Sequence, residues 1–349
     1  MRGAFRVQFV AGVAVVISVI AVFAGLRTAS AQSPPELERV AFLIATGPVG
    51  GSYLQAGEAL AITISHPPGL GRCSGEAVCG PRGLIATTRS SSGSIANALA
   101  VERETVQSAL IQGDVLAAAM QGSGPFAETG PLRNIRVLAR LHDEALHVVV
   151  GARSGIKRLS GLRGRRIAID TSNAATIFTA KALLASAGVK LSSVSFRQMP
   201  AEQAAEALRS GKIDGLVVMG VAPVAAVEPL VRRREARLLS VDARTLQRLT
   251  RKNPLYSRIN LPTEPYRLAR GVTTLGVASV WVVHERLDPG LAEKILRAFW
   301  APGNQTEIAR RLAFASGFDS RKAMAVGRLP VHAGARRFHA MTPAPGEAE

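Results

Sequence analysis

Short apolar runs alternate with longer amphipathic stretches along most of this chain. Val40–Ala45 is such a run, and a glycine-rich turn, Thr46–Ser52, separates it from an amphipathic segment that extends to about Ser65. The same succession recurs further along. Short apolar runs favour strands, whereas apolar positions spaced by three and four residues favour helices.

The predicted strands are Val40–Ala45, Leu84–Thr88, Ser108–Ile111, Ile135–Leu138, Ala145–Val150, Arg166–Ile169, Val194–Arg197, Gly215–Met219, Leu238–Val241 and Thr274–Val283. Further predicted helices are Val115–Met120, Thr176–Ala187, Ala201–Ser210 and Pro289–Trp300. Strands that alternate with helices predict a parallel-sheet α/β architecture. At 349 residues, two such lobes are expected.

The first 31 residues have the composition of an export signal. Arg2 and Arg6 precede an apolar run over residues 9–26, and Ala29–Ala31 form a small-x-small pattern. Together these features are typical of a secretory signal peptide. The run is also long enough to span a bilayer, so an uncleaved anchor is the alternative. We expect cleavage after Ala31 and a mature protein in the periplasm.

The formal net charge of +18 does not by itself identify a binding partner. A basic surface suits nucleic acid, an anionic membrane or an acidic ligand. The basic residues are scattered, with dense runs only at Arg163–Arg166 and Arg232–Arg234. The export signal and the lack of an appended helix-turn-helix argue against nucleic acid as a partner.

Cys73 and Cys79 are the only cysteines, and they lie close together in a turn-like stretch. In an exported protein such a pair is expected to form a small-loop disulfide. A metal site is the alternative, but two cysteines without nearby histidines supply too few ligands for a closed zinc site. The sequence therefore predicts a disulfide and no metal.

Motifs of several enzyme classes are missing. His142 and His147 are five residues apart, which misses the H-E-x-x-H spacing, and no G-x-S-x-G, P-loop or G-x-G-x-x-G motif occurs. No catalytic residue and no cofactor are predicted, and we expect no enzymatic activity. An exported enzyme stays an alternative, because a carboxylate acid–base pair leaves no sequence signature.

Three loops of small residues open helices: Gly47–Tyr53, Ser90–Asn97 and Thr171–Thr176. Helix N-termini expose free backbone N–H groups and a positive dipole end, so they favour anions. Ordinary capping is the alternative, because Ser, Thr and Asn are the usual caps of helices without a ligand.

These loops resemble motifs of the TAXI family of periplasmic receptors for tripartite (TRAP) transporters. The matching segments run in order as Ala45–Tyr53, Ser91–Asn97, Leu141–Val150, Ser154–Arg165 and Pro330–Ala335. Two segments depart from the family pattern. Asp170–Thr176 stands where the family has G-P-x-G-S-G-T, and Gln112–Asp114 stands where it often has Q-S-D.

The resemblance implies a type II periplasmic-binding-protein fold, with two α/β lobes joined by two hinge strands and a ligand cleft between them. Lobe one would comprise residues 32–144 and 274–349, and lobe two residues 145–273. Glu144 and His147 would tie the hinge. The implied ligand-binding residues are Gly51, Ser52, Tyr53, Ser92, Gly93, Ser94, Thr171, Ser172, Asn173, Thr176, Val221 and Pro223.

The implied function is capture of a small organic anion by hinge closure and its delivery to a TRAP-type membrane permease. The ligand would be an amino acid such as glutamate, a dicarboxylate or another organic acid. The receptor is expected to be a monomer. A periplasmic subunit that presents its ligand to a membrane sensor is the alternative.

Overall fold

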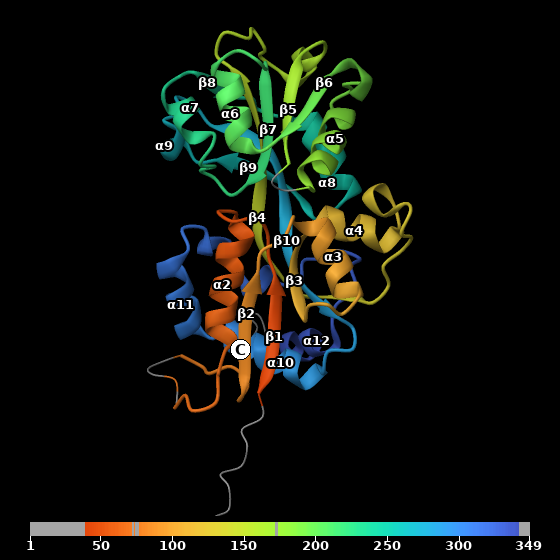
Figure 1. Ribbon diagram of the computed structural model, residues 1–349, viewed down its shortest axis with the longest axis vertical. Helices are drawn as coiled ribbons and strands as arrows, with labels where there is room; N and C mark the ends of the chain where they lie inside the picture. The colour runs from red at the N-terminus through yellow and green to blue at the C-terminus, as the bar shows by residue number, and fades with distance from the viewer. Residues whose placement is uncertain (1–38, 72, 74–76, 172–173, 342–349) are drawn as a thin grey trace, which may run out of the picture. The chain divides into compact units, whose positions relative to one another are not determined.

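Two long antiparallel strands, β4 (Ile135–Gly151) and β10 (Val272–His284), run through the middle of the fold (Figure 1). Almost every residue of both strands is buried, so their backbone groups need partners within the protein. The two strands pair with each other from Gly276 opposite Ala145 to His284 opposite Ile135. The computed structural model describes residues 39–71, 73, 77–171 and 174–341.

All strands of the described residues join one sheet in the order β2-β1-β3-β10-β4-β7-β5-β6, with β8 on β4 and β9 on β10. We call the part built on β1–β3 lobe one and the part built on β5–β9 lobe two. Within each lobe the pairs β1–β2, β1–β3, β5–β6 and β5–β7 are parallel. The other strands are β1 (Val40–Ala45), β2 (Leu84–Arg89), β3 (Ser108–Gln112), β5 (Arg166–Asp170), β6 (Ser195–Met199), β7 (Gly215–Gly220), β8 (Ala236–Leu238) and β9 (Tyr256–Leu261).

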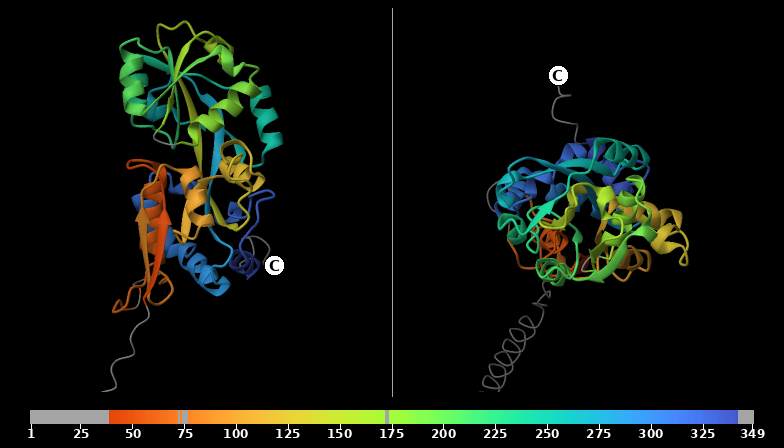
Figure 2. Two further views of the ribbon diagram at one scale, coloured as in Figure 1. Left: turned by 45° about the vertical axis from the view of Figure 1, so that its right-hand side comes forward. Right: turned by 90° about the horizontal axis from the view of Figure 1, so that it is seen from above.

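Helices cover both faces of the sheet in each lobe (Figure 2). In lobe one these are α2 (Ser52–Ile64), α10 (Pro289–Phe299), α11 (Pro302–Arg311) and α12 (Ala333–Met341) on one core, and α3 (Ser94–Glu102) and α4 (Gly113–Gln121) on the other. In lobe two these are α5 (Thr176–Ser186) and α8 (Ala243–Lys252) on one core, and α6 (Ala201–Arg209), α7 (Glu228–Arg232) and α9 (Thr263–Tyr266) on the other.

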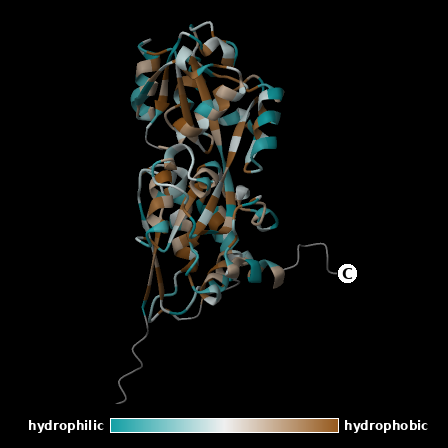
Figure 3. Ribbon diagram, turned by 90° about the vertical axis from the view of Figure 1, so that its right-hand side faces the viewer, coloured by the Kyte–Doolittle hydropathy of each residue, from teal (hydrophilic) through white to brown (hydrophobic). Residues whose placement is uncertain are grey.

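Short 3₁₀ turns lie at Gly124–Phe126, Leu159–Leu162, Leu191–Ser193, Ala315–Gly317 and Ser320–Lys322. In Figure 3 the strands are mostly brown, whereas many outward-facing helical turns are teal, as expected for amphipathic helices around an apolar sheet.

This architecture confirms the predicted fold class of two α/β lobes joined by two crossing strands. Three details of the prediction were wrong. Ile135–Leu138 and Ala145–Val150 are parts of one strand, because the polar residues between them still pair across to β10. The strand expected at Leu238–Val241 lies earlier, at Ala236–Leu238, where it pairs with the end of β4. The sheet is mixed rather than parallel, since β4 and β10 run against their neighbours.

The predicted lobe boundaries, 144/145 and 273/274, fall within β4 and β10 and stay a prediction. The signal peptide assigned to residues 1–31 lies outside the described residues. Among the helices that the structure describes, none has the length and hydropathy needed to cross a membrane. Cys73 and Cys79 form a disulfide, as expected, with their Cα atoms 5.4 Å apart.

Lobe one depends on packing around Trp281, which lies on β10 between Leu110 of β3 and Ala139 of β4. Its ring is fully buried and meets the ring of Phe299 edge to face, with centroids 5.6 Å apart. We expect Trp281→Ala to lower the free energy of unfolding by about 3–5 kcal/mol, because a large cavity replaces the indole. Urea unfolding followed by circular dichroism measures this loss.

Ile62→Ala is the matched control, because Ile62 lies on a helix of the same lobe with 54% of its surface exposed. It should change the unfolding free energy by less than about 0.5 kcal/mol. Equal effects of the two substitutions would show that the lobe-one core does not depend on Trp281.

Candidate functional site

The three loops of small residues follow β1, β2 and β5 and lead into α2, α3 and α5. Because β1 and β2 are parallel neighbours, their loops leave the same edge of the sheet. The loops also contact each other directly. Ser91 donates through its backbone N–H to the Gly47 carbonyl (3.1 Å), and Ala174 N–H donates to the Ser92 carbonyl (3.3 Å). The structure therefore brings loops from both lobes together.

Asn97 fixes the start of α3 against the sheet. Its buried side-chain amide donates to the carbonyls of Thr46 (2.5 Å) and Leu110 (2.7 Å). The amide thereby ties the end of β1 and the middle of β3 to the helix. Asn97 of the Ser91–Asn97 motif therefore has a structural role and does not need to contact a ligand.

The first turns of α2 and α3 carry no side-chain cap. Their N-cap residues are Gly51 and Gly93, and neither helix receives a cap hydrogen bond from a side chain. Gly93 has a φ of 98°, which favours glycine at this turn. The hydroxyls that follow are used elsewhere, since Ser52 bonds to Glu144 and Ser94 accepts from Gln112 N–H (2.9 Å). Ser52 and Ser94 therefore do not cap their helices, although Ser91 Oγ accepts from the N–H of the N-cap residue Gly93 (3.0 Å).

Beneath Ser52 lies a buried polar group of side chains, which we call the Glu144 cluster: Ser52, Tyr53, Gln112, Glu144 and Ser279. Glu144 on β4 is 3% exposed and accepts hydrogen bonds from Ser52 Oγ (2.7 Å) and Gln112 Nε2 (3.1 Å). Burial raises the pKa of its carboxyl, and these bonds only partly oppose the shift. Gln112 and Ser279 are paired neighbours on β3 and β10.

Several polar atoms of this cluster have no partner among the described residues. They are the Tyr53 hydroxyl, Gln112 Oε1 and Ser279 Oγ. The Tyr53 hydroxyl faces Ser94 and Ser279 without forming a bond of good geometry, and burial, followed by the Glu144 charge, raises its pKa. A buried polar group without a partner costs about 1–3 kcal/mol, so this cluster is a place where a ligand or water group would be stabilising.

The predicted site residues fall into three groups. Gly51, Ser52 and Ser92 lie on the loop edge of lobe one, where Ser92 is exposed. Gly93, Ser94 and Tyr53 are buried beneath them, with Tyr53 4% exposed and its ring against His142. On lobe two, Thr171 is exposed, Thr176 is buried with Oγ1 unpartnered among the described residues, and Val221 and Pro223 follow β7. Ser172 and Asn173 lie outside the described residues.

Asp114 links the two lobes from the start of α4. Its Oδ2 accepts from Thr179 Oγ1 of α5 (2.6 Å) and from the Tyr256 hydroxyl of β9 (3.0 Å), and its Oδ1 accepts from Val115 N–H (2.9 Å). Burial raises the pKa of this carboxyl. Asp114 is not among the predicted site residues, although a carboxylate between a buried strand and an apolar helix was a signal for it.

His147 on β4 forms part of a second buried network. Its Nδ1 lies 2.9 Å from the Ala145 carbonyl, which only accepts, so Nδ1 carries the proton and Nε2 accepts from the Tyr266 hydroxyl (2.9 Å). Val224 N–H in turn donates to Tyr266 (2.8 Å). The network attaches the segment after Pro223 to the crossing strand. Burial lowers the pKa of His147 to about 4, so the ring is neutral at pH 7.

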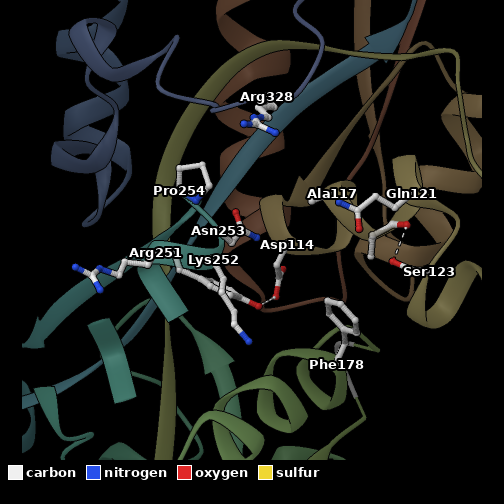
Figure 4. A pocket seen from close by; sticks show the side chains of 12 residues that line it. Asp114, Ala117, Gln121, Ser123, Phe178, Arg251, Lys252, Asn253, Pro254 and Arg328 are labelled. Atoms are coloured by element: carbon white, nitrogen blue, oxygen red, sulfur yellow. Dashed lines mark hydrogen bonds between the residues drawn. The ribbon is translucent and has the colours of Figure 1, made fainter. Parts of the chain in front are cut away.

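A cavity of about 590 Å³ lies beside Asp114 (Figure 4). Its lining residues are Asp114, Ala117, Ala118, Gln121, Ser123, Phe178, Arg251, Lys252, Asn253, Pro254, Tyr256 and Arg328. None of them belongs to the predicted ligand-binding set. Within the described part of the chain, no group of three or more His, Cys, Asp or Glu side chains could hold a metal ion.

Removing the Tyr266 hydroxyl tests the His147 network. We expect Tyr266→Phe to lower the free energy of unfolding by about 1–3 kcal/mol, because Val224 N–H and His147 Nε2 then lose their partner. Chemical unfolding of the variant beside the parent measures the loss. A change below about 0.5 kcal/mol would mean that water replaces the hydroxyl without cost.

Acid should destabilise the fold through its buried histidines. Burial lowers the pKa of both His142 and His147 from 6.5 to about 4, so the unfolded chain binds more protons between these values and stability falls as the pH falls from 6.5 to 4. The raised pKa values of Asp114 and Glu144 act in the opposite sense, because the native state then binds more protons.

Comparison of His142→Phe with the parent isolates the histidine contribution. The His142 ring packs against Phe314 and Phe318, and neither of its nitrogens has a partner among the described residues. The thermal midpoint of the variant should therefore decline less than that of the parent between pH 6.5 and pH 4. Parallel curves would contradict a depressed pKa at His142.

The chain is similar to one protein family in sequence and to several solved proteins in structure. The sequence profile of the NMT1-like family matches residues 44–340. A protein of Bordetella bronchiseptica RB50 has a similar structure, with a TM-score of 0.51 at 17% identity over 88% of this chain and 100% of the other. A Xanthomonas citri protein bound to ATP matches with a TM-score of 0.52 at 13% identity, covering 87% and 99% of the two chains.

The periplasmic sulfonate-binding protein of Methylobacillus flagellatus KT reaches a TM-score of 0.47 at 12% identity over 86% of this chain and 81% of its own. At such identities the likenesses concern the fold alone. The strand order and the two crossing strands match the type II periplasmic-binding-protein fold. With the match over residues 44–340, the chain belongs to the NMT1-like family.

Proposed function

We propose that this protein is an exported receptor of the TAXI type, which binds a small organic anion between its lobes and delivers it to a TRAP-type permease. The observation that carries the proposal is the contact among three loops, the first of which bonds to the Glu144 cluster through Ser52, with glycine as the N-cap residue of both α2 and α3. Two features of the sequence support it. Residues 1–31 have the composition of an export signal, and the motifs that resemble the TAXI family occur in the family's order.

The loop edge suits a carboxylate. Free N–H groups at the starts of α2 and α3 point out of helices whose dipoles favour negative charge. Ser92 and Thr171 add exposed hydroxyl donors from the two lobes. A carboxylate bound in this way needs no cationic side chain.

The Glu144 cluster favours a ligand that also carries an ammonium group. When ionised, the Glu144 carboxyl attracts a cation and repels the second carboxylate of a dicarboxylate. Its raised pKa shows that burial disfavours the lone charge, which an ammonium partner would offset. Amino acids are therefore favoured as ligands over dicarboxylates and other organic acids.

Closure would couple binding to transport. Ala174 of lobe two contacts Ser92 of lobe one, and Asp114 of α4 contacts Thr179 and Tyr256. A ligand that bonds to loops of both lobes adds its own contacts to this arrangement and so favours it over an open one. The permease would then recognise the closed surface.

A thermal-shift screen of residues 32–349 tests the proposal, with amino acids, 2-oxo acids, dicarboxylates and aromatic acids as probes. A ligand at 100 times its dissociation constant should stabilise the fold by about 2.7 kcal/mol and raise the thermal midpoint by a few degrees. Calorimetry on the best compound should show binding about tenfold or more weaker for Ser92→Ala/Thr171→Ala, because two donors to a charged group are lost.

Thr87→Ala is the matched control, since Thr87 is exposed on β2 and lies outside the loops. It should bind like the parent. If no compound shifts the midpoint after partial unfolding has removed any co-purified ligand, the receptor function is wrong. If a compound binds the double variant as tightly as the parent, the function stands but the site lies elsewhere.

A further inference from the structure

The described residues that line the cavity beside Asp114 include none of the predicted ligand-binding residues. One wall comes from α4 of lobe one, and the opposite wall from the start of α5 and from residues 251–256 of lobe two. Phe178 forms an apolar part of the lining and packs closely against Gly124, where a Cβ atom would lie 2.8 Å from its ring. The site thus exists only where the two lobes approach each other.

Three cationic side chains surround this cavity: Arg251, Lys252 and Arg328. All three are exposed, and none takes part in the ion pairs found among the described residues. Among the described lining residues Asp114 is the one acid, and its oxygens already accept from Val115, Thr179 and Tyr256. The cavity therefore has an excess of positive charge.

The place of Arg251 and Lys252 in the last turn of α8 has an ordinary explanation, because cations stabilise the C-terminal end of a helix dipole. That explanation does not cover Arg328, which comes from a distant segment. Gly327 has a φ of 62° and lies so close to Pro254 that a Cβ atom would collide with the proline ring. This close approach sets Arg328 beside the 251–254 segment.

The turn that carries the other cations is also fixed. Asn253 Oδ1 accepts from Leu255 N–H (2.9 Å), and the Asn253 carbonyl accepts from Tyr256 N–H (3.1 Å). In Figure 4, Arg328 and Lys252 lie on either side of Asn253, whereas the Arg251 guanidinium points outward from the rim. All three cations line the cavity, and Lys252 and Arg328 are the two whose charged ends do not point outward in this view.

A volume of about 590 Å³ lies within the range of small-molecule sites, which is about 300–1,000 Å³. Arginine offers a planar fork of donors for carboxylate or phosphate oxygens, and lysine a compact charge. An apolar wall with flanking cations suits an anion that also carries some carbon surface. We propose that this cavity binds a small polyvalent anion bearing carboxylate or phosphate groups, at a second site distinct from the loop edge.

Calorimetric titration of the parent protein with citrate and with pyrophosphate tests this site, and the two probes distinguish a carboxylate from a phosphate ligand. We expect saturable one-to-one binding of at least one probe. Arg328→Ala and Lys252→Gln should each weaken it about tenfold or more, because a charge-assisted hydrogen bond is lost. Both side chains are exposed, so the thermal midpoint without ligand should stay near that of the parent.

Arg244→Gln is the matched control, because Arg244 lies exposed on the same helix, α8, and does not line the cavity. It should bind the probe like the parent, and so should the loop variant Ser92→Ala/Thr171→Ala. Failure of both probes to bind would overturn the second site. Equal weakening by Arg244→Gln would also overturn it, since binding would then follow overall charge.

Discussion

The antiparallel pairing of β4 with β10 is the constraint on which the rest of the structure depends. Both strands are buried along nearly their whole length, and each hydrogen-bonds on its other side to the sheet of one or both lobes. Buried backbone groups must be paired, so neither strand can shift without breaking several ladders. The same two strands therefore join the lobes and fix which residues lie at their junction.

Polar side chains lie on these strands where an ordinary core would have apolar ones. Glu144 and His147 are buried on β4, and each has specific partners that reduce the cost of its burial. Their pKa values shift in opposite directions for the same reason, because burial favours the neutral form of both groups. Hydrogen bonds from specific partners thus stabilise polar groups where the two lobes meet.

The tertiary structure groups basic residues that lie far apart in the sequence. In the sequence the basic residues are scattered, with dense runs only at Arg163–Arg166 and Arg232–Arg234. In the structure the cations that share a cavity are Arg251, Lys252 and Arg328, which no run contains. Many other arginines pair with neighbouring acids on exposed helices, where such pairs contribute little to stability.

The sequence by itself determined the alternation of strands and helices, the loops of small residues at helix starts and the pairing of Cys73 with Cys79. These features follow from local periodicity, local composition and short separation, which need no knowledge of distant partners. Only the tertiary structure decided that residues 135–151 form one strand, that β4 and β10 run antiparallel, and that Asp114 meets Tyr256. Such contacts join residues far apart in the chain, and no local pattern specifies which of many possible partners is close in space.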